Sequence, residues 1–456
     1  MGEDRNPVVQ FVGRAWDQVK SPLYRNAFFI MLTSVIGNGL GFFFWIIVGR
    51  LYQGKVQDPG AAVALFQTIA FLGTIGNVGL GIGLIRFLPE TEDKVSLINA
   101  SLTVSGIASF VLSIGFLLTL PFFLPVFSFV YADESPLRVL LYVLTIIACT
   151  IAIGMAPTID DAAIAMRRAD LSTWRNTLFA LLKIPLVLIV FFLLLAGRAG
   201  VFLSIALSFG LSVAVTGFVL LPRAVPGYRP RPEWRFAIIR PVLRFALGNY
   251  AATAIGSAAA TLPAVMILAA LGASRGPSNA FYFYVALVVA SLLYIIPGAT
   301  FTSFYAEASQ KNADHRKDER RAIGLSLLLL IPGIAVMIFF SETMLRLFGD
   351  PNIAAQAVTP LRILTFASIP VFLNGILATR VRVRKRTLPL IVSAAIVTII
   401  TLGLGWVLLS NPDLGIDGLA YAYVFGQAAA TPYLYREARD AYDAIPTEPV
   451  FGQPLE

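Results

Sequence analysis

The sequence predicts an all-α membrane protein whose twelve transmembrane helices form two six-helix lobes, related as a parallel pseudo-twofold repeat. Three observations predict this fold. Of the 456 residues, 57% are hydrophobic and only 13% are charged, whereas soluble globular chains carry about 25% charged residues. The apolar residues gather in runs of about 20, the length that crosses a bilayer core as a helix. The basic residues concentrate on alternate connections between these runs, so we expect a multi-pass protein of the cell membrane.

Twelve apolar runs are long enough to span a bilayer. Their expected bounds are 27–48, 61–88, 97–122, 137–158, 176–197, 200–222, 247–272, 279–304, 321–341, 355–379, 387–410 and 416–435. Only the GRAG stretch, residues 197–200, separates the fifth run from the sixth. The N-terminal residues lack the basic start, short apolar core and cleavage site of a signal peptide, so the first run is expected to remain as an anchor.

The distribution of basic residues predicts the orientation of these spans. The N-terminus, the even-numbered connections and the C-terminus together hold 27 Lys and Arg residues, and the odd-numbered connections hold six. Cytoplasmic segments of membrane proteins carry an excess of Lys and Arg, so both termini are expected in the cytoplasm. The net charge of +9 then reflects topology and attraction to anionic lipid headgroups, and no nucleic-acid partner is expected.

The longest connection, residues 223–246, is rich in Pro and Arg and divides the chain into two sets of six spans. Because six is even, both halves enter the membrane in the same direction, as in the parallel repeats of several transporters. The expected segments are a cytoplasmic N-terminal segment 1–26, an N-terminal lobe 27–222, a basic linker 223–246, a C-terminal lobe 247–435 and a cytoplasmic tail 436–456.

A weak internal match supports the repeat. Aligning the first span on Asn26 with the seventh on Asn249 places Pro263 opposite the GNGLG stretch at 37–41. A second alignment, of spans two and eight, places Pro297 opposite the glycine-rich part of span two. Residues that weaken a helix therefore fall at matching depths in both halves. Interrupted helices at corresponding positions are the best sequence indication of a transporter's central site.

The stretch GNVGLGIGLIRFLPE, residues 76–90, packs four glycines into its first eight positions. A dinucleotide fingerprint needs G-x-G-x-x-G between a strand and a helix. Here Gly79 and Gly81 fit, but Leu84 occupies the third glycine position, and an apolar membrane run surrounds the stretch. We therefore reject nucleotide binding, and no cofactor is expected.

The same glycines have a spacing that suits membrane helices. Gly79 and Gly83 are four residues apart, and so are Gly37 and Gly41. Small residues at this spacing let two membrane helices approach closely. The pattern fits simple helix packing, and it also fits a flexible helix that lines a cavity.

Several amide side chains fall within or beside the apolar runs. Gln67 and Asn77 share a helical stripe in span two, Asn38 lies in span one, and Asn249 lies at the start of span seven. An unpaired amide is costly in hydrocarbon. We expect Asn38 and Asn77 to face one another, the bundle interior or water. Structural pairing and cavity lining both fit the pattern.

The charged residues expected to be buried or nearly buried in the spans are basic. Lys183 lies inside span five and Arg362 inside span ten, Arg86 lies near the inner end of span two, and Arg25 and Arg50 flank span one. No Asp or Glu lies in the middle of a span. Ionisable groups inside a membrane are functional candidates by default, and arginine matches phosphate geometry. A cavity lined in this way suits an anionic cargo.

Each basic residue also has a structural interpretation. Arg86 can pair with Glu90 or extend to the headgroups, and Arg25 and Arg50 can anchor their helix at the membrane interface.

The single cysteine, Cys149, excludes an internal disulfide and a cysteine-based metal site. The single histidine, His315, excludes a site with several histidine ligands, so neither a metal site nor catalytic residues are expected.

Four stretches of the chain resemble the polysaccharide-transporter and O-antigen flippase branch of the multidrug/oligosaccharidyl-lipid/polysaccharide exporter superfamily. They read IIVGRLYQGKVQDPGAAVALFQTIAFLGTIGNVGLGIGLIRFLPE, RRADLSTWRNTLFALLKIPLVLIV, LRLFGDPNIAAQAVTPLRIL and NPDLGIDGLAYAYVFGQ. They extend from Ile46 to Gln427, so the resemblance covers nearly the whole chain.

The resemblance implies two six-helix lobes around a central, often cationic cavity. It implies that the protein moves an oligosaccharide on a polyprenyl phosphate or pyrophosphate from the inner to the outer leaflet, by alternating access, for cell-surface polysaccharide or lipopolysaccharide synthesis. Related lipid flippases use arginines in the first two helices, which favours Arg25, Arg50 and Arg86 here. Expected partners are this anionic lipid-linked glycan, membrane lipids and glycan-assembly enzymes, and the chain is expected to be a monomer.

Three other functions compete with this interpretation. A major-facilitator transporter also has six plus six spans, but the loop RFLPETEDKVS lacks the signature of that class. A cation-coupled multidrug antiporter of the same superfamily is disfavoured by the absence of a carboxylate in the middle of a span. A membrane glycan polymerase or ligase is disfavoured because the predicted outer loops are short and contain no histidine.

Overall fold

The computed structural model describes residues 22–123, 125–131, 135–194, 197–308, 315–384 and 386–439. This part of the chain is almost entirely helical. Side chains are described over the same ranges, apart from 22–35 and a few shorter stretches. The side chains of Arg25 and Asn249, two of the predicted site residues, lie outside this description.

The first half of the chain forms one group of helices. Its elements are α2 (Pro22–Leu51), α3 (Gln57–Asn77), α4 (Leu80–Phe87), α5 (Lys94–Phe123), η1 (Pro125–Val130), α6 (Pro136–Ala165), α7 (Ala169–Ile189), η2 (Val190–Leu194), α8 (Arg198–Val215), η3 (Thr216–Leu220) and α9 (Leu221–Ala224). We call this group the N-terminal lobe.

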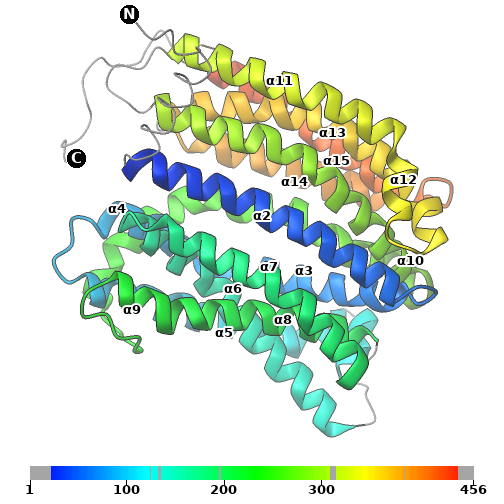
Figure 1. The fold of residues 1–456 in the computed structure, drawn as a ribbon, viewed down its shortest axis with the longest axis horizontal. Coiled ribbons are helices and arrows are strands. Elements are labelled where there is room, and N and C mark those ends of the chain that lie inside the picture. Colours follow the sequence, from blue (N-terminus) through cyan, green and yellow to red (C-terminus); the bar gives the residue numbers. More distant parts are fainter. Residues whose placement is uncertain are drawn as a thin grey trace, which may run out of the picture.

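The second half forms the C-terminal lobe. Its elements are α10 (Phe236–Ala308), α11 (His315–Phe339), α12 (Ser341–Arg346), α13 (Pro351–Val383), α14 (Leu388–Leu409) and α15 (Gly415–Ala438). Figure 1 shows α2 running between the two groups, with α12 at one end of the bundle and α4 and α9 at the other. We call these the α12 end and the linker end.

Nine helices of the described residues are long and apolar enough to cross a membrane. One of them, Tyr250–Phe301, covers 52 residues and contains both the seventh and the eighth predicted span. It changes direction at Gly272, whose φ of 69° only glycine adopts readily. α2 contributes the shorter apolar segment Ile36–Leu51, and α15 is not among the nine. The all-helical membrane fold is therefore confirmed, and the count of twelve spans stays a prediction.

The glycine-rich stretch of span two is a break between two helices. α3 ends at Asn77 and α4 begins at Leu80, and the two residues between them have positive φ, 55° at Val78 and 75° at Gly79. A β-branched residue in this region of φ is a genuine outlier. Such strain costs of order 1–3 kcal/mol and persists only where the surroundings hold it.

In the described residues of the second half, the positions aligned with these glycines lie in a continuous helix. α10 passes through Pro263 and Pro297, and Gly272 is the residue within it whose dihedrals are not helical. α2 likewise continues through Gly37 and Gly41. Proline inside a helix removes one hydrogen bond, which neighbouring helices can compensate in a membrane. The expected interruption is therefore found at the span-two glycines and not at Pro297 opposite them. In the other aligned pair, neither Pro263 nor the GNGLG stretch of span one interrupts its helix.

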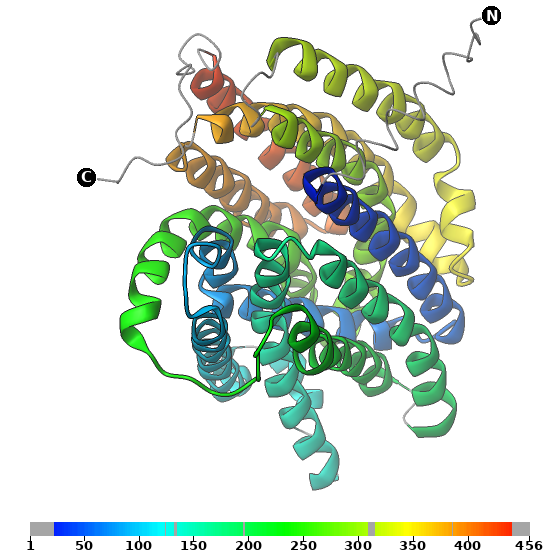
Figure 2. The same ribbon diagram turned by 60° about the vertical axis from the view of Figure 1, so that its left-hand side comes forward.

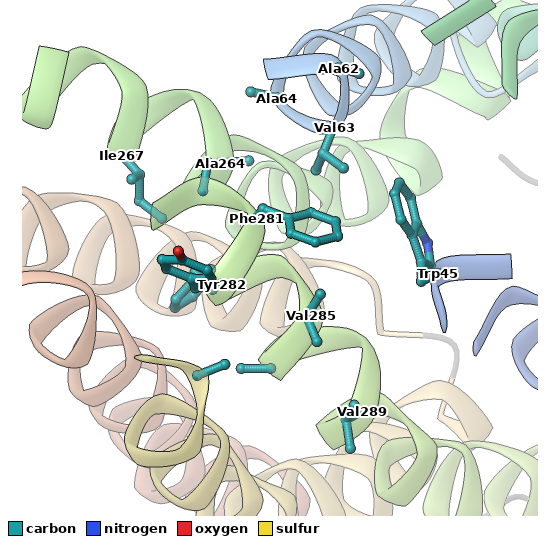
Figure 3. Packing of buried hydrophobic residues seen from close by; sticks show 14 of the residues in the cluster. Trp45, Ala62, Val63, Ala64, Ala264, Ile267, Phe281, Tyr282, Val285 and Val289 are labelled. Atoms are coloured by element: carbon teal, nitrogen blue, oxygen red, sulfur yellow. The ribbon is translucent and has the colours of Figure 1, made fainter. Parts of the chain in front are cut away.

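The two lobes pack against each other along α2, α3 and the second part of α10. Trp45 of α2 lies against Phe281 and Tyr284 of α10, with ring centroids 6.0 and 4.9 Å apart. Figure 3 shows Phe281 pointing towards Trp45 and Val63 of α3. Gly60 of α3 packs so closely against the backbone of α10 that a Cβ there would collide with Pro277. This apolar contact forms the main core between the lobes.

The lobes also touch at the α12 end. The backbone N–H of Gly54 donates to Oδ2 of Asp350, at 2.8 Å, and a Cβ at Gly49 would lie 2.7 Å from the carbonyl oxygen of Phe348. Glycine is required at Gly49 because the backbone of the other lobe leaves no room for a side chain.

The predicted basic linker docks onto the N-terminal lobe. Asn99 of α5 donates to the carbonyl of Arg229, at 3.0 Å, and the N–H of Glu233 donates to Thr103 Oγ1, at 2.9 Å. Arg235 pairs with Asp93 at 3.2 Å. The helix that follows begins at Phe236, within the range expected for the linker. Figure 2 shows this segment as an extended loop that passes beneath the N-terminal lobe and leads into α10.

Candidate functional site

Lys183 of α7 is buried in the N-terminal lobe, with 7% of its surface exposed. Its ammonium lies over two aromatic rings, 5.1 Å from the centroid of Phe44 and 5.0 Å from that of Phe179. A Cβ added at Gly41 of α2 would lie 3.6 Å from Nζ, so this glycine leaves space for the ammonium. Within the described part of the chain, the ammonium of Lys183 contacts aromatic faces rather than a carboxylate.

Lys183 belongs to a column of alternating basic and aromatic side chains on α7. Arg175, Phe179 and Lys183 follow at intervals of four residues, which places them above one another on one helix face. The guanidinium of Arg175 lies 5.6 Å from the centroid of the Phe209 ring of α8. Phe209 and Phe179 pack edge to face, with centroids 5.0 Å apart. Cation–π contacts of this kind are worth about 0.5–2 kcal/mol each.

Arg175 is also buried, with 5% exposure, and it forms a bidentate ion pair with Asp160 of α6. Its Nε donates to Oδ1 at 2.8 Å and its Nη2 to Oδ2 at 2.5 Å, and Nη2 also donates to Asn176 Oδ1 at 3.1 Å. The Nη1 group is buried without a hydrogen-bond partner. The two charges of this pair thus compensate each other, whereas the charge of Lys183, two turns further along α7, faces aromatic rings.

Asp161 follows Asp160 on α6 and faces a different helix. Its carboxylate packs against Gly81 of α4, where a Cβ would collide with it. Both aspartates lie within α6, which extends to Ala165 and so beyond the predicted end of span four at residue 158. The two aspartates therefore lie in the last turns of α6, and no Asp or Glu lies in the middle of this helix.

The other predicted basic residues lie outside this cluster. Arg86 is exposed and pairs with Glu90 at 3.4 Å, which is the structural interpretation of that residue. Arg50 is exposed and its Nε donates to the carbonyl of Leu347 in the other lobe, at 2.9 Å. Arg362 is exposed and its Nε donates to Ser341 Oγ, at 3.0 Å. None of these contacts brings its residue to Lys183.

The amide of Asn77 is satisfied within the N-terminal lobe. Asn77 is buried, and its Nδ2 donates to the carbonyl of Gly154 at 2.8 Å and to Thr158 Oγ1 at 2.9 Å, both on α6. Of the two alternatives for this residue, structural pairing is the one that the contacts favour. Asn38 and Gln67 are half-buried on α2 and α3.

The sequence interpretation missed Arg175 and Asp160. It placed Arg175 in a connection because span five was expected to begin at residue 176, whereas α7 begins at Ala169. The spacing of four between Arg175, Phe179 and Lys183 was a signal that could have found it. The described residues contain no group of three metal-binding side chains.

The chain matches the family model described as polysaccharide biosynthesis protein over residues 23–304. The chain belongs to this polysaccharide biosynthesis protein family. The MatE family model matches residues 308–407 of its second half. No curated protein matches the sequence.

Solved structures with the same fold are multidrug transporters and their relatives. An inward-facing MATE family transporter of the MOP superfamily is 16% identical, with a TM-score of 0.65 over 91% of this chain and 99% of its own. An outward-facing MATE transporter gives 17% identity and a TM-score of 0.62, over 93% and 96% of the chains. A MOP superfamily transporter from Pyrococcus furiosus, described as having a binding pocket of reverse polarity, gives 16% and 0.61 over 93% and 96%.

Together, these matches establish the fold of this member of the polysaccharide biosynthesis protein family and the kind of protein it is. It has the two-lobe fold of the MOP superfamily, it is a multi-pass membrane transporter, and it is not an enzyme. The resemblance stated from the sequence is confirmed at this level.

Proposed function

We propose that the protein is a flippase that moves a polyprenyl phosphate- or pyrophosphate-linked oligosaccharide from the inner to the outer leaflet, for cell-surface polysaccharide synthesis of the O-antigen type. The observation that carries the proposal is the buried Lys183 ammonium, held by Phe44 and Phe179. The family match to polysaccharide biosynthesis proteins supports it.

A buried ammonium among aromatic rings is poised for an anionic ligand. Removing a charge from water costs several kcal/mol unless it is compensated, and two cation–π contacts compensate only part of that cost. A phosphate that reaches Lys183 supplies the missing compensation through charge-assisted hydrogen bonds. Arg175 remains paired with Asp160, so in this proposal it positions α7 and does not bind the cargo itself.

The proposed transport path avoids the hydrocarbon core. The hydroxyls of an oligosaccharide lose their water in lipid without replacement, whereas a cavity between the lobes keeps them hydrated and leaves the lipid tail in the bilayer. Export of one negative charge from an inside-negative cell gains about 2.3 kcal/mol per 100 mV. Alternating access requires the lobes to separate in turn at each end. The strained break at Val78 and Gly79, between α3 and α4, packs against Tyr250 of the other lobe.

A second candidate is a cation-coupled multidrug antiporter. The observation that favours it is Asp161, a carboxylate inside α6 that packs against Gly81, together with the fold shared with MATE transporters. In that mechanism a carboxylate would bind the coupling cation. The flippase interpretation ranks first because the family that covers most of the chain is the polysaccharide one and because the ammonium of Lys183 is buried against aromatic rings.

The test uses purified protein in liposomes and two cargoes. A fluorescent polyprenyl pyrophosphate-linked oligosaccharide is placed in one leaflet, and its arrival in the other is measured by quenching. Efflux of a fluorescent organic cation against a proton or sodium gradient is measured in parallel. We expect transfer of the lipid-linked glycan and no coupled efflux of the cation. Coupled cation efflux without glycan transfer would replace the flippase by the antiporter.

A further inference from the structure

A separate pocket with several polar groups lies in the C-terminal lobe. It is an open pocket lined by α10, α13, α14 and α15, and it has a volume of about 280 Å³. None of its lining residues belongs to the N-terminal lobe. Pockets for small molecules usually measure about 300–1,000 Å³, so this one has room for a single small ligand and not for a lipid-linked chain.

Small side chains create the space. Ala252, Gly256 and Ala259 of α10 line the pocket together with Ala394 of α14 and Ala430 of α15. A Cβ at Gly256 would lie 3.7 Å from the Cβ of Ala394, which is an ordinary van der Waals contact. A larger side chain at Gly256 would therefore project into the pocket without a clash at its first carbon.

Hydrogen bonds fix the polar groups of the pocket. Asn374 Nδ2 donates to the backbone carbonyl of Gln427 at 2.8 Å and to its Oε1 at 3.2 Å, and Thr431 Oγ1 donates to Asn374 Oδ1 at 2.9 Å. These bonds join α13 to α15 and hold both amides in one orientation. The ring of Tyr423 also lines the pocket. A few fixed polar groups beside an aromatic face are typical of sites that orient a small ligand.

The charge of the pocket is positive. Arg382 lines it, and none of the described residues that line it is an Asp or a Glu. Two neighbouring arginines are paired with carboxylates, Arg380 with Glu319 at 2.6 Å and Arg386 with Glu437 at 2.7 Å. Arg382 follows Asn374 by eight residues, about 12 Å along the helix axis. The pocket therefore has amides towards one end and a guanidinium towards the other.

We propose that this pocket binds an acidic sugar residue, a hexose ring that carries a carboxylate. The amides of Asn374 and Gln427 and the ring of Tyr423 would face the sugar, and the guanidinium of Arg382 would bind the carboxylate, the group it matches in geometry. The ligand is either a free uronic acid or a residue of a glycan, and the second source rests on the proposed function. A site without a carboxylate is unsuited to a cation.

The test is a calorimetric titration of the purified full-length protein with glucuronate, glucose and inorganic phosphate. We expect glucuronate to bind at least tenfold more tightly than glucose or phosphate. Arg382→Ala should reduce glucuronate affinity to that of glucose, and Arg382→Lys should keep part of it. Arg240→Ala is the matched control, since Arg240 is exposed on α10 and does not line the pocket. Gly256→Leu should abolish binding by filling the space, whatever Arg382→Ala does to folding.

Three results would overturn the proposal. The first is that the wild type does not bind glucuronate, and the second is that it binds phosphate as tightly as glucuronate. The third is that both Arg382→Ala and Gly256→Leu bind glucuronate as tightly as the wild type. Competition by a soluble glucuronate-containing oligosaccharide separates the two sources of ligand. Because the titration needs no lipid-linked cargo, loss of flipping with retained glucuronate binding would contradict only the proposed function.

Discussion

The hydroxyl of Tyr250 in α10 donates a hydrogen bond to the backbone carbonyl of Thr74 in α3. In an unbroken helix the N–H of Val78 would donate to that carbonyl, but it donates to Ile75 instead, at 3.0 Å. The break in span two thus frees an acceptor, and a residue from the other half of the chain satisfies it. This bond ties the strained break to the helix that opens the C-terminal lobe.

Tyr250→Phe should weaken this connection while keeping the ring. An unsatisfied buried carbonyl costs about 1–3 kcal/mol, so we expect a lower melting temperature in detergent and a changed rate of lobe movement, read from a pair of fluorescent labels on the two lobes. Tyr421→Phe is the control, because Tyr421 is exposed on α15. Equal melting temperatures and label kinetics for both variants would mean that the hydroxyl does not hold the break.

Gly79→Ala tests the break itself. Gly79 has a φ of 75°, and a Cβ there would lie 2.5 Å from the Cβ of Tyr250. The left-handed conformation costs an L-residue about 1–2 kcal/mol, and the collision adds to this. We expect a clear loss of thermal stability and of transport. Gly39→Ala, in a helical position with open space around it, should retain both, and a Gly79→Ala variant as stable as Gly39→Ala would contradict the description of the break.

The Arg175–Asp160 pair should be essential for folding rather than for cargo. Removing one partner of a buried ion pair costs about 3–5 kcal/mol, because the other charge is left uncompensated. Asp160→Asn should therefore lower the melting temperature strongly. Glu90→Gln, which removes the exposed partner of Arg86, should change stability by at most about 1 kcal/mol. Similar effects of the two substitutions in a thermal-shift assay would show that the Arg175 pair is not a structural element.

The helical membrane fold could be predicted from apolar runs because hydrocarbon forces each run to satisfy its own backbone hydrogen bonds. The interruption of span two was visible in its glycines, and the break falls at Val78 and Gly79. Pro297 carried a similar signal, yet α10 stays helical there. Proline weakens a helix, but whether the helix breaks depends on packing with distant segments, which sequence spacing does not contain.

The candidate site was predicted only in part, for a related reason. Lys183 stood out because a charge inside an apolar run has few alternatives. Arg175 did not, because its helix begins earlier than the apolar run and its partner Asp160 lies on another helix. Arg50 and Arg86 are also basic but lie in the last turns of α2 and α4, and Arg362 lies within α13 but is exposed. Only their tertiary contacts distinguish them from Lys183.

The most direct test of the flippase proposal is the rate at which Lys183→Met transfers a polyprenyl pyrophosphate-linked oligosaccharide between the leaflets of proteoliposomes. Methionine fills the aromatic pocket without a charge, and Lys183→Arg and the exposed Lys55→Ala serve as controls. We expect Lys183→Met to fold and to transfer the cargo at least tenfold more slowly than the wild type, Lys183→Arg to keep part of the rate, and Lys55→Ala to keep all of it. Transfer by Lys183→Met at the wild-type rate would contradict the assignment of Lys183 to the anionic headgroup.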